Sequence, residues 1–323
     1  MTSVQGSWTV PAIRRGSRKG AFASTWIGAA APPGDAGPFI QIGTQDWNMS
    51  AADSVGYLGL TSYDGAFWSD NVHHFHPQFL FTVYPGDRMS ASLSLKGGRW
   101  RLSIVNRTLG ESAHFSTSQE ADAAFNEAEW LQEDPGGTKK PVPYPRLSTV
   151  SFSRLAVNSA APRYADLYSG WMSEDGTNWA PTPLRNDSFR LQRASVSAAG
   201  AQYLRIIKPM DAASRKFFGL AGAWTARTPR KQIAAETSTY AAVLRNTSSA
   251  LRRSAWPSSV RQLVGLLAAD QLANASRWRA MTSLAPSRRA AAVSKLLPVY
   301  GNPDNHGHLV RRALHIPEIT PQS

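Results

Sequence analysis

The first 210 residues alternate short apolar stretches with clusters of turn-forming residues. Six stretches of strand length are rich in Val, Thr, Phe, Trp and Tyr, and Gly, Pro, Asn or Asp separates them. They are residues 20–28, 38–43, 79–84, 89–95, 100–105 and 149–155. This regular spacing, with no long helical period between the stretches, predicts an antiparallel β-sandwich or barrel and argues against a parallel α/β sheet.

The pattern changes near residue 210, beyond which Ala, Leu and Arg dominate. Residues 256–259 (Trp-Pro-Ser-Ser) predict a helix start, because proline is favoured in the first helical turn. The apolar residues that follow share one helical face: Val260, Leu263, Val264 and Leu267. Residues 233–251 and 287–297 are two further predicted helices. We therefore expect a β domain over residues 1–210 and a basic, Ala- and Arg-rich helical extension of unknown role over residues 211–323.

The composition excludes several classes of protein. With 323 residues, 42% of them hydrophobic, the chain can bury a large core and is not disordered throughout. It has no cysteine, which excludes disulfides, thiolate zinc sites and a cysteine nucleophile. No apolar stretch approaches the roughly 18 residues needed to cross a bilayer. The first twenty residues contain no secretory signal pattern, so we expect a cytoplasmic protein or a mature secreted form.

The net charge of +13 is unevenly distributed. Residues 1–210 hold 19 Lys/Arg and 17 Asp/Glu, whereas residues 211–323 hold 16 and 5. A cationic segment attracts acidic proteins, nucleic acid or an anionic membrane surface, but arginines spread over several helices are also ordinary solvated surface. The extension has few, widely spaced aromatic residues and no nucleic-acid-binding motif, so these alternatives stay open.

Familiar catalytic and metal-binding motifs are absent. The sequence contains no G-x-S-x-G, H-E-x-x-H, P-loop or G-x-G-x-x-G motif. His74 and His76, with His73 beside them, would share a face of an extended segment and could bind a metal. No third ligand follows from the spacing, and polar loop histidines are the alternative interpretation. We expect neither a metal nor a cofactor.

Three segments carry a more specific pattern. They are residues 26–28 (Trp-Ile-Gly), residues 39–43 (Phe-Ile-Gln-Ile-Gly) followed by Asp46-Trp47, and residues 126–135, which contain Glu129 and Glu133. On a strand, Gln41 shares a face with Gly43, which places an amide beside a residue that leaves room for a ligand. Glu129 and Glu133 likewise share a face. Carboxylates on a half-buried strand indicate either ion pairing or function.

These segments resemble the motifs of the glutamic peptidases (eqolisins), over roughly residues 5–205. The family's W-[VI]-G, L-Q-x-G with D-W, and A-E-[WF]-[IL]-x-E-D motifs correspond here to residues 26–28, 40–47 and 128–134. The resemblance implies a lectin-like sandwich of two antiparallel sheets and an acid-acting endopeptidase. It places the catalytic glutamine on Gln41 and the catalytic glutamate on Glu133 rather than on Glu129.

The resemblance also implies residues around the dyad. We expect four side chains to line the cleft or support it: Trp26, Asp46, Asp70 and Glu129. Two of them depart from the family pattern. One more residue precedes Asp46 than in the family motif, and Asp70 stands where relatives carry a glutamate.

A carboxylate and an amide suffice for peptide hydrolysis. The carboxylate of Glu133 would take a proton from water and return it to the leaving amine, while Gln41 would orient the water and stabilise the oxyanion. The ordinary glutamate pKa of about 4.3 predicts moderately acidic working conditions. The alternative function is a catalytically silent lectin-like sandwich that binds peptide or glycan. The presence of both Gln41 and Glu133 in their motifs favours the enzyme over the silent binding module. The partner of such an enzyme would be a protein or peptide substrate.

Overall fold

The computed structural model of the chain describes residues 1–31, 38–48, 64–119, 124–134, 143–174, 177–225, 227–284, 288 and 305–317. The chain divides into two compact units. The first comprises residues 1–167 and 172–193, and the second comprises residues 168–171 and 194–323.

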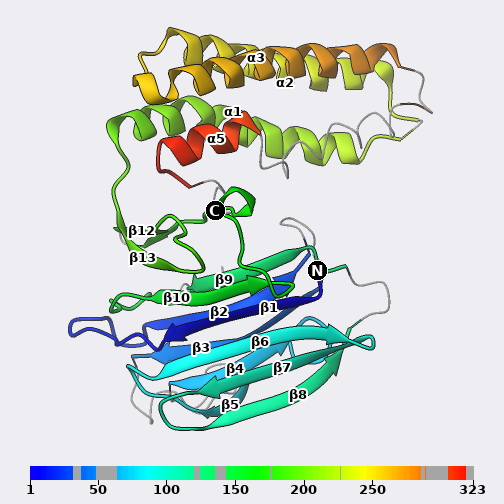
Figure 1. Ribbon diagram of the computed structural model, residues 1–323. Coiled ribbons are helices and arrows are strands. Elements are labelled where there is room, and N and C mark those ends of the chain that lie inside the picture. The colour runs from blue at the N-terminus through cyan, green and yellow to red at the C-terminus, as the bar shows by residue number, and fades with distance from the viewer. Residues whose placement is uncertain are drawn as a thin grey trace. The chain divides into compact units, whose positions relative to one another are not determined.

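The first unit is a sandwich of two antiparallel sheets (Figure 1). Within the described residues, the larger sheet has eight strands in the order β11-β12-β13-β10-β1-β6-β7-β8, and the smaller has five in the order β5-β4-β3-β2-β9. The larger sheet contains β1 (Ser3–Thr9), β6 (Arg88–Lys96), β7 (Arg99–Asn106), β8 (Ser112–Ser118), β10 (Ser151–Val157), β11 (Met172–Glu174), β12 (Thr177–Pro181) and β13 (Phe189–Ala194). The smaller contains β2 (Phe22–Ala30), β3 (Phe39–Trp47), β4 (Gly65–Asp70), β5 (Gln78–Thr82) and β9 (Glu127–Glu133).

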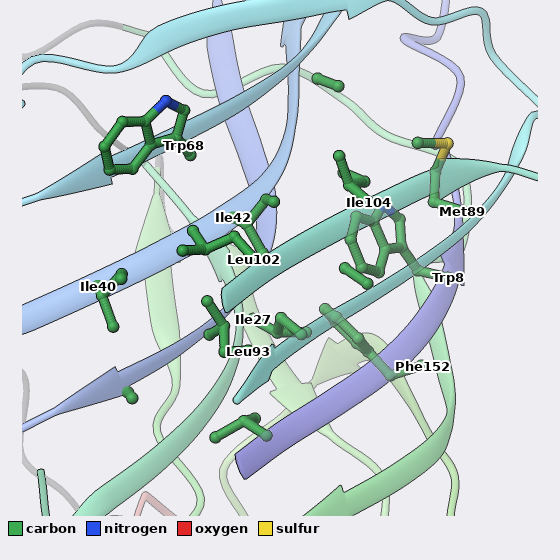
Figure 2. Packing of buried hydrophobic residues seen from close by; sticks show 14 of the residues in the cluster. Trp8, Ile27, Ile40, Ile42, Trp68, Met89, Leu93, Leu102, Ile104 and Phe152 are labelled. Carbon is green, nitrogen blue, oxygen red and sulfur yellow. The ribbon is translucent and has the colours of Figure 1, made fainter. Parts of the chain in front are cut away.

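Alternating side chains build the core between the sheets. From Met89 to Leu93 in β6 and along β7, every second residue is buried, as expected for strands with one face on a core. Figure 2 shows the residues that meet there: Trp8, Ile27, Ile40, Ile42, Trp68, Met89, Leu93, Leu102, Ile104 and Phe152. The indole Nε1 of Trp8 donates a 3.0 Å hydrogen bond to Thr44 Oγ1 and so links the two sheets. The predicted antiparallel sandwich is confirmed, and all six predicted strand stretches coincide with strands.

The second unit is helical. It contains α1 (Ala198–Gly222), α2 (Arg230–Arg253), α3 (Ser258–Ala280) and α5 (His306–Ala313). The ring of Phe217 stacks on Tyr240 with 4.4 Å between centroids, and its edge meets Trp278 at 4.8 Å. No helix in the described part of the chain has both the length and the apolar character needed to cross a membrane.

Two of the three predicted helices are confirmed. Residues 233–251 lie within α2, and α3 begins at Ser258, directly after Pro257. The predicted helix over residues 287–297 lies outside the described residues, apart from Arg288.

Helix α1 was not predicted from the sequence, and it moves the division of the chain. The units separate at residues 193 and 194, earlier than the composition change near residue 210. The reason is that α1 begins at Ala198 and runs through Pro209 without ending. Its first turn is capped by Ser197, whose Oγ accepts a 3.0 Å hydrogen bond from the Gly200 N–H. Ser197 is therefore the residue in the sequence that marks the start of α1 and of the helical unit.

Candidate active site

A row of four residues crosses the outer face of the five-stranded sheet. Gln41 in β3 pairs with Gly28 in β2 and with Ser69 in β4, and Gly28 pairs with Glu129 in β9. Residues that pair directly project to the same face of a sheet. Glu129, Gly28, Gln41 and Ser69 therefore form one row over four neighbouring strands.

This row lies on the face that turns away from the core. Ile40 and Ile42, the neighbours of Gln41 in β3, are fully buried in the core between the sheets. Successive side chains of a strand point to opposite faces, so Gln41 points outward. The same holds in β2, where Ile27 packs in the core and Gly28 follows it.

Because residue 28 is a glycine, no side chain projects from β2 between Glu129 and Gln41. Two interstrand steps separate the Cα atoms of Glu129 and Gln41, which corresponds to about 10 Å. A Cβ added to Gly28 would lie 2.7 Å from Cζ3 of Trp26 and 3.2 Å from the carbonyl oxygen of Ile40. The ring of Trp26 thus lies against Gly28, between the carboxyl group of Glu129 and the amide of Gln41.

The amide of Gln41 is held at one end. Its Nε2 donates a 2.7 Å hydrogen bond to Ser69 Oγ. This bond uses one of the two amide hydrogens. Among the described residues, the second N–H and the carbonyl oxygen have no further partner, so they are available to a water molecule or a substrate carbonyl.

The carboxyl group of Glu129 is strongly perturbed. Burial, followed by the nearby carboxylates of Glu127 and Glu133, raises the pKa of Glu129 to about 7. Each of these causes disfavours the ionised form. Glu129 is therefore mostly protonated below neutral pH and is able to give a proton to a bound group. A perturbed carboxyl in an open row beside an amide is typical of a functional site.

Glu133 lies on the same face but farther from Gln41. It pairs with Ser24, which pairs with Gln45, so it lies four residues along the strand from the row of Gln41, or about 13 Å. Trp26 Nε1 donates a 2.8 Å hydrogen bond to Glu133 Oε2, and Ser24 Oγ donates one of 3.3 Å. Burial raises the pKa of Glu133 above its ordinary value overall, although these two bonds lower it in part. The structure thus brings Glu129, and not the predicted Glu133, into register with Gln41.

Asp46 lies on the core face of the sheet, so of the two expected roles it does not line the cleft. It pairs with Ala23, a core residue, and it lies five positions from Gln41, so its side chain points to the opposite face. The carboxyl group is fully buried, and neither oxygen has a hydrogen-bond partner among the described residues. Burial, then the nearby Asp64, raises the pKa of Asp46 well above its ordinary value. Gln45, which the motifs do not single out, is the residue of this segment on the face of Gln41.

The substitution Asp46→Asn is expected to stabilise the protein at pH 7 and to do so less at pH 4. The folded-state pKa of Asp46 lies above the unfolded one, so its carboxyl favours folding most below about pH 4 and this contribution is lost as the pH rises. The asparagine amide does not ionise, so its contribution to stability is not lost as the pH rises. Urea unfolding followed by circular dichroism at pH 4 and pH 7 measures the difference, with Asp187→Asn as the control. Equal effects of Asp46→Asn at both pH values would contradict the assignment.

Asp70 also lies on the core side of the sheet. It pairs with Ile40, is fully buried, and accepts hydrogen bonds from the backbone N–H groups of His73 and His74 at 2.6 and 2.9 Å. Thr117 Oγ1 of β8 donates another of 3.1 Å. Although burial raises the pKa of Asp70, these bonds lower it overall. Asp70 closes the turn after β4 and ties the two sheets together, so its side chain does not lie on the face of Gln41.

The three neighbouring histidines serve separate contacts. His73 Nδ1 lies 3.2 Å from Asp70 Oδ2, His74 packs edge-on against Trp68, and His76 packs against Phe75. Among the described residues, no group of three or more His, Cys, Asp or Glu side chains is placed to hold a metal ion.

The fold and the row together define a β-sandwich protein whose outer sheet face carries a protonatable carboxyl group and a glutamine amide, a pair suited to hydrolysis. The model of the Peptidase A4 family matches residues 1–174. Because this match covers more than half of the sequence, the chain belongs to the Peptidase A4 family, the glutamic peptidases. The resemblance seen in the motifs is confirmed. The protein is a peptidase, and its substrates are proteins or peptides.

Several solved structures are similar to this chain. Scytalido-glutamic peptidase with a transition state analog inhibitor is 16% identical, with a TM-score of 0.45 over 60% of this chain and 92% of that one. Aspergilloglutamic peptidase from Aspergillus niger is 17% identical, with a TM-score of 0.43 over 54% and 99%. Tailspike protein 2 of bacteriophage CBA120 is 12% identical, with a TM-score of 0.25 over 49% and 23%. No curated protein matches the sequence.

Proposed function

We propose that the protein is an acid-acting glutamic endopeptidase in which Gln41 and Glu129 act on the scissile peptide bond. The observation that carries this proposal is the row in which Glu129 and Gln41 stand on either side of a glycine, on the outer face of the sheet. An extended peptide laid over Gly28 would meet the carboxyl group on one side and the amide on the other.

The raised pKa of Glu129 gives it the role of proton donor. As water attacks the scissile carbon, Glu129 protonates the carbonyl oxygen, and the carboxylate so formed takes a proton from the attacking water. Glu129 then passes this proton to the leaving nitrogen as the C–N bond breaks. The new carboxylic acid product returns a proton to Glu129, which restores the starting state.

Gln41 acts by hydrogen bonding. Its carbonyl oxygen accepts from the attacking water, and its second N–H donates to the former carbonyl oxygen, on which partial negative charge develops while the proton of Glu129 is being transferred. The 2.7 Å bond to Ser69 fixes the amide, so the group is preorganised before the substrate arrives.

Glu133 and Trp26 support this arrangement. The 2.8 Å hydrogen bond from Trp26 to Glu133 holds the indole against Gly28. The negative charge of Glu133 also contributes to the raised pKa of Glu129. Glu133 is therefore proposed as a positioning residue.

The pH dependence of cleavage tests the protonation state. With a denatured protein as substrate, kcat/KM is expected to be high in acid and to fall tenfold per pH unit above about pH 7, because only protonated Glu129 donates. Initial rates between pH 2 and pH 9 measure this profile. A kcat/KM that rises through pH 7 would show that Glu129 acts first as a base. A folded protein without activity at any pH would contradict the proposed endopeptidase and favour a binding module.

A further inference from the structure

A pocket of about 610 Å³ in the first unit is lined by five arginines. They are Arg14, Arg15, Arg146, Arg190 and Arg193, and Trp179 lies among them. None of the lining residues belongs to β2, β3, β4, β5 or β9, the strands of the sheet that carries Glu129 and Gln41. The pocket is thus a second feature of the β-sandwich, separate from the catalytic row.

This concentration of arginines does not follow from the charge of the surrounding unit. Residues 1–193 hold 17 Lys/Arg and 17 Asp/Glu, so the β-sandwich has no net charge, whereas residues 194–323 hold 18 and 5. Five of the 17 basic residues of a neutral unit line one pocket. An even distribution over the surface would not bring so many together.

The five guanidinium groups have no acidic partner in the part of the chain that the structure describes. Among the described residues, no carboxylate forms an ion pair with any of them, and no acidic residue lines the pocket. Like charges held in one concavity repel each other and concentrate the positive potential there. A bound anion would remove this repulsion.

Three separate chain segments hold the arginines in place. The Arg14 N–H donates a 2.6 Å hydrogen bond to the Arg146 carbonyl oxygen, and the Arg146 N–H donates one of 2.9 Å to Ser17 Oγ. Arg190 pairs with Ser151 of β10. The guanidinium of Arg193 lies over the ring of Trp179, 5.7 Å from its centroid. The backbone is therefore fixed where the side chains converge.

We propose that this pocket binds a small molecule that carries two or more phosphate groups. All five cations are arginines, whose planar fork matches the oxygen pairs of phosphate better than the point charge of lysine does. Five positive charges exceed what one carboxylate could neutralise, whereas clustered phosphates carry that charge in a volume the pocket can hold. Specificity for phosphate over a carboxylate peptide follows from this charge density.

Calorimetric titration of the full chain with inorganic tripolyphosphate at 150 mM NaCl tests the proposal. The double substitution Arg146→Gln with Arg190→Gln is expected to weaken binding by about 100-fold, because each charged hydrogen-bonding group contributes about tenfold. The control is Arg101→Gln with Arg107→Gln, which removes the same charge from exposed positions on and after β7 that do not line the pocket, and it is expected to change affinity less than about twofold. The basic helical unit is intact in both variants.

Further measurements distinguish binding at this pocket from general electrostatic attraction between the protein and anions. Arg146→Lys keeps the charge but loses the fork, so it is expected to weaken binding by about tenfold. Equal weakening in the pocket and control variants, or no binding by the wild type, would overturn the proposal. A hexa-aspartate peptide or a single-stranded oligonucleotide that binds the pocket more tightly than tripolyphosphate would overturn it in favour of that class of ligand.

Discussion

Replacing Glu129 by glutamine is expected to lower kcat/KM for a denatured protein substrate by about 1000-fold, the middle of the range for a lost general acid. Glutamine preserves the size of the side chain and its hydrogen-bonding ends but cannot donate and retake a proton. The matched substitution Glu133→Gln is expected to cost only about tenfold, because an amide oxygen at that position still accepts from Trp26 Nε1. Initial rates at pH 4 for the wild type and both variants give the two ratios.

The pair of substitutions distinguishes the two assignments of the catalytic acid. Both glutamates lie on the outer face of β9, so any general effect on this strand affects both variants. Circular dichroism and the urea midpoint establish that each variant is folded. A large loss in Glu133→Gln together with near-normal activity in Glu129→Gln would reverse the assignment and restore the dyad expected from the motifs.

The substitution Gln41→Leu is expected to lower kcat by about 100-fold to 1000-fold, the usual effect of removing one donor to an oxyanion. Leucine fills a similar volume but offers neither an N–H nor a carbonyl oxygen. The interaction develops with the charge on the oxyanion, so the loss falls on kcat more than on KM.

Two variants serve as controls for Gln41. Gln45→Leu removes the same group from the same face of β3, four residues away, and is expected to leave kcat within about tenfold. Ser69→Ala removes only the hydrogen bond that orients the Gln41 amide and is expected to lower kcat by roughly tenfold. Gln45→Leu as damaging as Gln41→Leu would contradict the assignment of Gln41.

The strand pattern predicted the architecture and part of the site, and its limits have a physical origin. The period of two placed Gln41 on one face of its strand and both Glu129 and Glu133 on one face of theirs, and the structure agrees. The period alone could not indicate which of the two glutamates lies in register with Gln41. That choice depends on the register of β9 against β2, which is set by hydrogen bonds between segments about 100 residues apart in the chain.

The placement of Asp46 could have been derived from the sequence. Residues five apart in a strand point to opposite faces, so Gln41 and Asp46 could not both face the cleft. The motif suggested otherwise because one extra residue precedes Asp46. Asp70 is different, since only the packing of β4 against β8 shows that its carboxylate binds the turn at His73 and Thr117.

Gly28 has a consequence for how this enzyme can change over evolutionary time. A glycine inside a strand weakens the sheet, so a β-branched residue there would ordinarily improve strand formation. At this position any side chain would press on the Trp26 ring and stand between Glu129 and Gln41. The clash with the Trp26 ring and the Ile40 carbonyl oxygen would destabilise the sheet, and under the proposed mechanism the added side chain would also lower turnover. Selection for a more stable sheet therefore has to act elsewhere in the sandwich.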